Sequence, residues 1–442
     1  MVTTTQLAIR YQPVTALRPY PQNARTHTKH QIRQIANSIR TFGFTNPVIV
    51  DRNNRIIAGH GRVEAAKLLS LDYVPTIMLE DLTEDQIRAY ILADNKLAEN
   101  AGWDRGILAI ELQHLMTVED LDFDITVTGF EVPEIDLILN EQPQDEHDPD
   151  DELPRKSADA VTAVGDLWLL GNHQILCGDV RDESSLERLT EGRKAALVFT
   201  DPPYNVVIDG NVSGKGAVKH GDFAMAAGEM SPEEFTQFLE SSLGMLAMHS
   251  ANGAVHFVCM DWRHMGEMLA AGTKVYDTLL NLCTWVKNNG GQGSFYRSRH
   301  ELVFVFRNGK GRYRNNIQLG QFGRYRSNVW EYPAVRGLSQ QQDDEGNLLA
   351  LHPTVKPVAM VADAILDCSA RGDLVLDGFL GSGSTLIAAE RVGRICYGVE
   401  LDPKYVDVAV RRWQRYSGQQ AVHALNGRRF DEASNKRQVI HG

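Results

Sequence analysis

Short, almost wholly apolar runs alternate with helical stretches through the second part of the chain, and this alternation constrains the fold more than any other feature. The apolar runs lie at 196–199, 254–260, 374–377 and 395–400. Helices are predicted at 232–249, 358–370, 384–392 and 403–416. Strands without a polar face must be covered on both sides, so the pattern predicts an α/β fold with an open, largely parallel sheet and helices on both faces. In such folds, ligands bind beyond the carboxyl ends of the strands.

The chain has 442 residues, enough for two or three domains at ~150 residues each. Residues 141–157 carry seven acidic and two basic side chains and three prolines, without apolar periodicity. A segment of this composition cannot bury enough surface to order itself, so we expect an acidic flexible linker. It separates a domain of residues 1–140 from a domain of residues 158–442.

The first domain is predicted to be a small α+β unit. Ile32, Ile35 and Ile39 fall at helical spacing, and Gly43 stands where such a helix would stop. Two short apolar strands flank a turn at 53–54. Thr83, with Gln86 three residues later, has the form of a capping box that begins another helix.

The formal net charge of −12 by itself argues against a nucleic-acid partner. Residues 284–336, the basic region, nevertheless carry ten Lys or Arg against only Glu301 and Glu331, a net charge of +8. Aromatic residues lie between these basic ones, a composition suited to binding phosphates and stacking on bases, although a solvated basic face would look the same. The candidate DNA-binding residues are Lys287, Arg297, Arg299, Arg312, Arg314, Arg324 and Arg326.

The cysteines and the hydropathy exclude several classes of protein. Five cysteines include no CxxC pair, which supports neither a disulfide framework nor a zinc ribbon, and no metal site is expected. The first residues show no basic stretch followed by an apolar run, and no run approaches ~18 apolar residues. We therefore expect a cytoplasmic protein that does not span a membrane.

A motif that can carry chemistry directly follows the first of these strands: Asp201, Pro202, Pro203 and Tyr204. The prolines lack N–H donors, while their carbonyl groups remain free to accept. The Asp201 carboxylate and the Pro202 carbonyl could each accept one N–H of a planar exocyclic amine, and Tyr204 offers a ring for stacking. A rigid turn is the alternative interpretation, disfavoured by the position after a buried strand.

The strand at 374–377 runs into a glycine-rich loop and then a helix, as in nucleotide-binding units. The third glycine of the dinucleotide fingerprint is missing, which counts against a nicotinamide cofactor. About twenty residues later, Glu400 and Asp402 close the next strand, where an acidic side chain can accept hydrogen bonds from ribose hydroxyls. The candidate cofactor-binding residues of the loop are Asp377, Phe379, Gly381, Gly383 and Ser384.

With these motifs in this order, the chain from about 160 to 420 resembles the DNA amino-methyltransferases in their β arrangement. The resemblance implies a Rossmann-like fold that binds S-adenosylmethionine as cofactor. In that family the residue matching Asp179 contacts the cofactor's adenine, and a segment matching His352, Thr354 and Lys356 helps to hold its methionine end. Gly378 stands where the family usually has proline, which predicts a looser loop.

The resemblance also implies direct in-line methyl transfer to an exocyclic nitrogen of a flipped base in double-stranded DNA, with about 207–350 as the target-recognition region. The family more often pairs DPPY with adenine N6 and SPPY with cytosine N4, so adenine N6 is favoured and cytosine N4 is the alternative. Absence of the Pro-Cys signature argues against carbon methylation. The resemblance leaves open whether the protein forms a homodimer. It also leaves open whether the enzyme acts with a companion restriction endonuclease or is an orphan of phage or prophage origin.

Residues 8–100 resemble the ParB N-terminal domain of chromosome-partitioning proteins. Gly59 and Arg62 match the helix start that binds nucleotide phosphates there, whereas His60 and Gly61 replace the usual Glu and Arg and disfavour nucleotide hydrolysis. A partition-type DNA-binding protein with a non-catalytic methyltransferase scaffold is thus a second hypothesis. The intact Asp179, Asp201 and Glu400 favour the enzyme, because a scaffold has no need of them.

Overall fold

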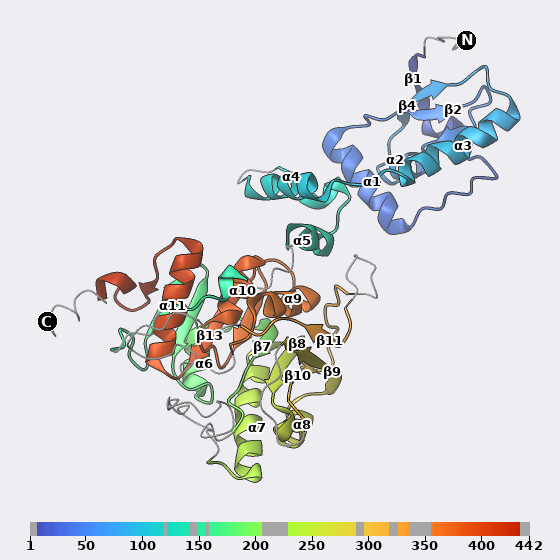
Figure 1. Ribbon diagram of the computed structural model, residues 1–442. Coiled ribbons are helices and arrows are strands. Elements are labelled where there is room, and N and C mark those ends of the chain that lie inside the picture. The colour runs from blue at the N-terminus through green and yellow to red at the C-terminus, as the bar shows by residue number, and fades with distance from the viewer. Residues whose placement is uncertain are drawn as a thin grey trace. The chain divides into compact units, whose positions relative to one another are not determined.

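The computed structural model describes residues 7–118, 122–140, 148–154, 159–205, 229–288, 296–317, 326–335 and 355–433. The chain divides into two compact units, Met1–Glu141 and Gln142–Gly442 (Figure 1). No helix among the described residues is long and apolar enough to cross a membrane.

The first unit begins with a four-stranded sheet in the order β1-β4-β2-β3. Its predicted elements are confirmed: α1 ends at Gly43, the two predicted strands pair antiparallel around 53–54, and Thr83 and Gln86 form the capping box of α3. The elements are β1 (Ile9–Pro13), α1 (Lys29–Phe42), β2 (Val48–Val50), β3 (Ile56–Ala58), α2 (His60–Leu68), β4 (Tyr73–Met78) and α3 (Glu84–Glu99).

Two further helices complete the first unit and were not predicted from the sequence. They are α4 (Arg105–Thr117) and α5 (Val132–Asn140), which share a small core of Leu112, Ile135 and Ile138. The turn before α5 is held against α1, because Gln34 donates a hydrogen bond to Glu131 at 2.8 Å. The helix pair is therefore joined to the ParB-like part through α1.

The second unit contains a sheet that is ten strands wide in the part of the chain that the structure describes, in the order β11-β9-β10-β8-β7-β12-β13-β6-β5-β14. Its centre, β8-β7-β12-β13-β6, is parallel as predicted, while both flanks contain antiparallel pairs. The strands are β5 (Leu167–Leu170), β6 (His173–Cys177), β7 (Ala195–Thr200), β8 (Ser250–Met260), β9 (Thr278–Val286), β10 (His300–Arg307), β11 (Val329–Glu331), β12 (Leu374–Asp377), β13 (Ile395–Glu400) and β14 (Val422–His423).

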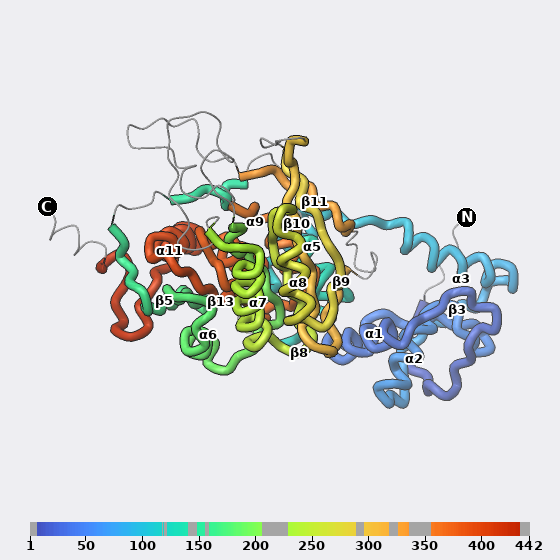
Figure 2. Tube along the Cα trace, turned by 90° about the horizontal axis from the view of Figure 1, so that it is seen from below, coloured from blue at the N-terminus to red at the C-terminus, as the bar shows by residue number. Residues whose placement is uncertain are grey.

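Helices cover both faces of this sheet, each over its own apolar core (Figure 2). One core contains side chains of α9 (Val358–Cys368), α10 (Ser384–Arg391) and α11 (Pro403–Ser417). The other contains side chains of α6 (Glu183–Thr190), α7 (Pro232–Met248) and α8 (Met265–Val275). The predicted α/β layers are thus present.

Part of the predicted flexible linker is ordered, which corrects that expectation. Residues 148–152, here called the docking segment, lie on the second unit and contain a short 3₁₀ turn. Arg391 pairs with Asp148 at 2.6 Å, and Arg412 donates to the Asp150 carbonyl at 2.7 Å. The Asp151 carboxylate accepts the amide of Val358, the first residue of α9, at 2.8 Å. The acidic side chains of the docking segment thus pair with arginines of α10 and α11, which explains why an acidic segment is ordered here.

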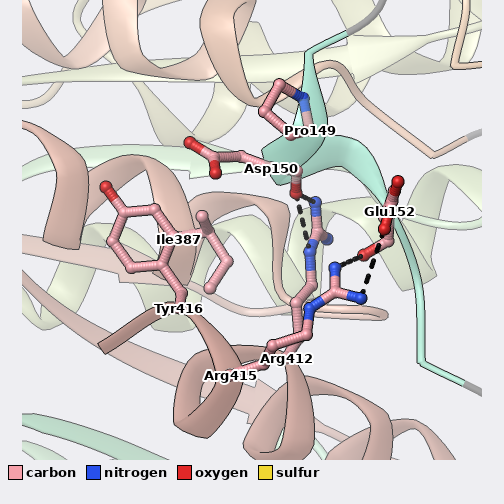
Figure 3. A pocket seen from close by; sticks show the side chains of 7 residues that line it. All are labelled: Pro149, Asp150, Glu152, Ile387, Arg412, Arg415 and Tyr416. Atoms are coloured by element: carbon pink, nitrogen blue, oxygen red, sulfur yellow. Dashed lines mark hydrogen bonds and ion pairs between the residues drawn. The ribbon is translucent and has the colours of Figure 1, made fainter. Parts of the chain in front are cut away.

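The docking segment also walls a pocket of about 410 Å³, lined by Pro149, Asp150, Glu152, Ile387, Arg412, Arg415 and Tyr416. Figure 3 shows Arg412 and Arg415 reaching from α11 toward the backbone of this segment. Arg412 is fully buried, and its other guanidinium nitrogen donates to the Ser382 carbonyl at 3.2 Å. One arginine therefore links the docking segment to the glycine-rich loop.

The expected recognition region of about 207–350 includes elements of the central fold. Residues 232–286 and 300–307 build α7, β8, α8, β9 and β10, which belong to the sheet and its covering layer. The glycine-rich stretch 208–229 falls almost wholly outside the described residues.

Candidate active site

Four acidic side chains lie at the carboxyl ends of four neighbouring parallel strands. The sheet places β7, β12, β13 and β6 side by side in that order. Asp201 follows β7, Asp377 ends β12, Glu400 ends β13, and Asp179 lies two residues after β6. Since the strands are parallel, the predicted motifs share one edge of the sheet, where ligands bind in such folds.

Asp201 lies among buried and half-buried ionisable side chains, here called the Asp201 cluster: Asp201, Tyr204, Lys287, Glu301 and Lys356. Both carboxylate oxygens of Asp201 have partners, because Oδ1 accepts from the Tyr204 hydroxyl at 2.6 Å and Oδ2 from the Lys356 ammonium at 2.5 Å. The same ammonium and the same hydroxyl each lie 3.0 Å from Oε2 of Glu301. Lys287 pairs with the other oxygen of Glu301.

Two carboxylates and two ammonium groups balance one another in this cluster, but the two acids differ. Burial raises the pKa of Asp201, with Lys356 opposing the rise and Glu301 adding to it. Burial also disfavours charge on Glu301, yet Lys356 and Lys287 together lower its pKa to about 2. Burial is outweighed at Lys356 as well, where the two carboxylates raise its pKa. Glu301 is therefore the fixed anion, and Asp201 is the acid that gains a proton more readily.

Asn205 fixes the end of the catalytic motif. Its backbone has φ of +52°, in the left-handed region, and its side chain bonds both backbone groups of Met230, at 2.8 and 3.2 Å. On the strand side, the Thr200 hydroxyl donates to Asp377 at 2.8 Å. The motif is thereby anchored to the neighbouring strand and to Met230, two residues before α7.

The glycine-rich loop between β12 and α10 is held by Glu400. One carboxylate oxygen of Glu400 accepts the amide of Gly381 and the other accepts the amide of Asp402, both at 2.8 Å. Gly381 and Gly383 have φ of +53° and +87°, which favours glycine at both positions. Burial raises the pKa of Glu400 to about 7 and that of Asp377 to about 6. A glycine cradle beside one buried and one half-buried carboxyl group fits a ligand with hydroxyl and ammonium donors, as S-adenosylmethionine has.

Gly378 does not loosen the loop, contrary to the expectation from its glycine. A Cβ at this position would lie 2.7 Å from Cγ2 of Val180 and 3.1 Å from a methyl carbon of Leu246. Both neighbours are buried. The space that a side chain of residue 378 would occupy is thus filled by Val180 and Leu246.

The other expected cofactor residues have varied environments. Asp179 pairs with Arg181 at 2.6 Å, and the Phe379 ring lies 5.9 Å from that of Phe238. Asp402 caps the N-terminus of α11 through the amide of Lys404. The Ser384 hydroxyl accepts from Arg412 at 3.3 Å. Lys356 lies in the Asp201 cluster, and His352 and Thr354 fall outside the described residues.

The candidate DNA-binding residues separate into two groups. Arg326 is mostly buried and pairs with Asp363 and Asp367 of α9 at 3.1 and 3.2 Å, and Lys287 belongs to the Asp201 cluster. Both residues therefore pair with carboxylates of this chain, instead of lying exposed as expected for a contact with DNA. Arg324 falls outside the described residues. The exposed candidates are Arg297, Arg299, Arg312 and Arg314.

The candidate phosphate-binding residues of the first unit lie at the start of α2. Gly59 has φ of +100°, and the Arg62 guanidinium packs directly against it while donating to the Pro47 carbonyl at 3.3 Å. His60 accepts the amide hydrogen of Tyr20 at 3.2 Å, so its ring has a structural partner. The structure therefore brings Gly59 and Arg62 together.

Sequence reasoning missed Glu301 and Trp285 as parts of the site. Glu301 faces Trp285 across the β9–β10 register, and the Trp285 ring lies 4.7 Å from the Lys287 ammonium and 5.8 Å from that of Lys356. The available signal was that Glu301 is one of only two acids in the basic region. An acid in a basic stretch, placed within an apolar strand, indicates a buried ion pair.

Three family models match the chain. The DNA methylase model matches residues 195–411, the ParB N-terminal domain model matches residues 2–96, and the model of the ParB-methyltransferase HTH domain matches residues 106–164. The third match covers α4 and α5 and continues through the docking segment. The helix pair α4 and α5, which was not predicted from the sequence, thus falls within the HTH match.

Two curated relatives and one solved structure illustrate the similarity. The ParB-like nuclease domain-containing protein YnaK of Escherichia coli (strain K12) is 52% identical over 81 residues, 18% of this chain and 93% of that protein. The type II methyltransferase M.HinfI of Haemophilus influenzae is 32% identical over 140 residues, 31% of this chain but only 38% of that enzyme. The solved PvuII DNA methyltransferase (cytosine-N4-specific) is 17% identical, with a TM-score of 0.41 over 60% of this chain and 91% of that one.

Proposed function

This chain belongs to the N6/N4 family of DNA methyltransferases and carries ParB N-terminal and HTH domains, and we propose that it methylates the exocyclic N6 of adenine at specific sites in double-stranded DNA. Its cofactor is S-adenosylmethionine. The observation that carries the proposal is the shared sheet edge of the Asp201 cluster and the glycine-rich loop.

The chain's own residues would prepare the amine and hold the cofactor. The Asp201 carboxylate and the Pro202 carbonyl each accept one N–H, which draws the nitrogen toward a tetrahedral geometry and frees its lone pair. S-adenosylmethionine supplies an electrophilic sulfonium methyl group. Glu400 and the loop amides orient the cofactor, and Asp201 favours the positive charge that develops on the nitrogen.

Adenine is favoured over cytosine because DPPY, in the family that the motifs resemble, goes more often with adenine N6. The target base must leave the duplex to reach Asp201, at a cost of a few kcal/mol. The exposed arginines of the basic region are candidates to hold the phosphates of the deformed strand. The HTH helices offer a second surface for DNA contact.

The test is methyl transfer from labelled S-adenosylmethionine to unmethylated duplex DNA, followed by digestion and mass spectrometry of the nucleosides. We expect N6-methyladenine from the wild type and none from Asp201→Ala. N4-methylcytosine would refute the adenine assignment alone. Robust labelling of DNA by Asp201→Ala would refute the role of the carboxylate.

Asp182→Ala is a matched control, because this surface aspartate caps α6 through the amide of Ser184 and lies outside the Asp201 cluster. It should keep its methyl-transfer activity. Equal losses in both variants would indicate damage to the fold rather than to the chemistry.

A further inference from the structure

Each oxygen of the Asp201 carboxylate already accepts one hydrogen bond before any substrate is bound. Tyr204 donates to one oxygen at 2.6 Å and Lys356 to the other at 2.5 Å. An incoming amine must also donate to this carboxylate if Asp201 is to act as proposed. Each oxygen can accept a second hydrogen bond, so the amine could share the carboxylate with these two donors, but the carboxylate accepts it more strongly once a present donor turns to another acceptor.

Moving Lys356 away from Asp201 is costly unless its charge keeps another partner. The side chain of Lys356 is only 4% exposed, and a buried ammonium without a counter-charge is strongly disfavoured. The alternative partner is already in place, because Oε2 of Glu301 lies 3.0 Å from the same ammonium. The Tyr204 hydroxyl is likewise 3.0 Å from that oxygen. Both groups can leave Asp201 without losing their last hydrogen-bond acceptor.

Glu301 is suited to this task by its own surroundings. It is 4% exposed, begins a buried stretch of β10, and is held through its second oxygen by Lys287. Lys287 in turn lies over the ring of Trp285, the cross-strand neighbour of Glu301. The carboxylate is thus fixed on the sheet, whereas Lys356 lies outside the sheet, two residues before α9.

We propose that Glu301 is a positioning residue for methyl transfer, which takes over Lys356 and the Tyr204 hydroxyl when the target amine enters and so leaves Asp201 free to accept the amine. The inference rests on the proposed function. Glu301 itself touches neither the base nor the cofactor in this scheme. It acts through Lys356 and Tyr204.

The first test is a set of kinetic measurements on Glu301→Gln, which keeps the shape of the side chain but removes its charge. We expect kcat for DNA methylation to fall about 10- to 100-fold, as for other losses of catalytic positioning, with KM for S-adenosylmethionine nearly unchanged. Glu301→Asp, which keeps the charge, should recover part of the loss and serves if Glu301→Gln folds poorly. Glu390→Gln is the matched control, because Glu390 bonds His173 and Trp413 away from the cluster. Its kcat should stay at the wild-type value.

The pH profile separates positioning from simple structural support. The groups that face Asp201 are Tyr204, Lys356 and Glu301, with Asp377 and Cys259 nearby. Removing the negative charge of Glu301 favours ionised Asp201, so the acid limb of kcat should move to lower pH in Glu301→Gln. A side chain that only supports the fold would leave that limb in place.

A double-mutant cycle with Lys356→Met completes the test. If Glu301 acts through Lys356, Glu301→Gln should lower kcat far less in the Lys356→Met background than alone. Additive effects, an unmoved acid limb or an unchanged kcat in Glu301→Gln would each overturn the inference while the proposed function stands. No DNA methylation by the wild type would overturn both.

Discussion

Replacing Gly378 by alanine adds one methyl group to the turn that follows β12, at the position where the resembled family usually has proline. The new Cβ would lie 2.7 Å from Cγ2 of Val180, and 3.1 and 3.2 Å from the two methyl carbons of Leu246. Carbon atoms pack best at about 3.5–4.0 Å, so a neighbour must move by up to ~1 Å. Val180 is 2% exposed and Leu246 is fully buried, so neither can turn toward solvent.

Overpacking of this kind costs about 1–3 kcal/mol. At about 2 °C per kcal/mol for a unit of this size, the Tm should fall by about 2–6 °C. The measurement is scanning calorimetry of the full chain, following the transition that S-adenosylmethionine shifts upward, because ligand binding to the native state identifies the methyltransferase unit.

Gly244→Ala is the matched control, since a Cβ at this position of α7 meets no atom within 4 Å. It should leave Tm unchanged or raise it slightly, because alanine favours helix over glycine. In the Val180→Ala background, Gly378→Ala should cost less than it does alone. A Gly378→Ala protein as stable as Gly244→Ala would refute the packing argument, and so would strict additivity with Val180→Ala.

Three further predictions follow from contacts described above. Ribose hydroxyls favour the ionised form of Glu400, so the affinity for S-adenosylmethionine should fall about tenfold per pH unit below about 7, and binding should release a proton. Titration calorimetry in two buffers measures both the affinity and the proton release. Glu400→Gln should abolish the pH dependence and the proton release. Arg326→Gln should lower Tm without changing the salt dependence of DNA affinity. Arg312→Gln should reduce the slope of log affinity against log salt concentration by about one. The opposite pattern would show that Arg326, and not Arg312, contacts DNA. Arg412→Met should cost about 1–3 kcal/mol by leaving the Asp150 and Ser382 carbonyls without their donor, and the more exposed Arg415→Met should cost less in the same thermal melts.

The parts of the fold that the sequence predicted are those with a strong local signal. The apolar strands at 196–199 and 374–377 needed only their composition, and the ends of α1 and α3 needed only Gly43 and the Thr83–Gln86 pair. The flanking strands were harder, because β9 alternates in burial and β10 lies in a basic stretch that suggested a surface.

The site residues that the sequence missed depend on contacts between distant segments. Glu301 becomes part of the Asp201 cluster only because β10 is in the same sheet as β7, with β8 between them. Arg326 was assigned to DNA from its neighbours in sequence, yet its counter-charges Asp363 and Asp367 come from a helix about forty residues away. Pairing of charges over such distances is set by the topology, which local composition does not contain.

The docking segment decides where this chain can be divided. A methyltransferase unit that starts at residue 158, as the acidic composition would suggest, loses the carboxylate that caps α9 and the carbonyl that satisfies Arg412. Lys356 of the Asp201 cluster lies two residues before Val358, whose amide the Asp151 carboxylate accepts. Arg412 also donates to the carbonyl of Ser382, which lies in the glycine-rich loop. Loss of the docking segment would therefore reach both parts of the site. A fragment meant to isolate the methyltransferase unit should therefore begin before Asp148, so that the docking segment stays with α9 and α11 although the HTH family model also extends over it.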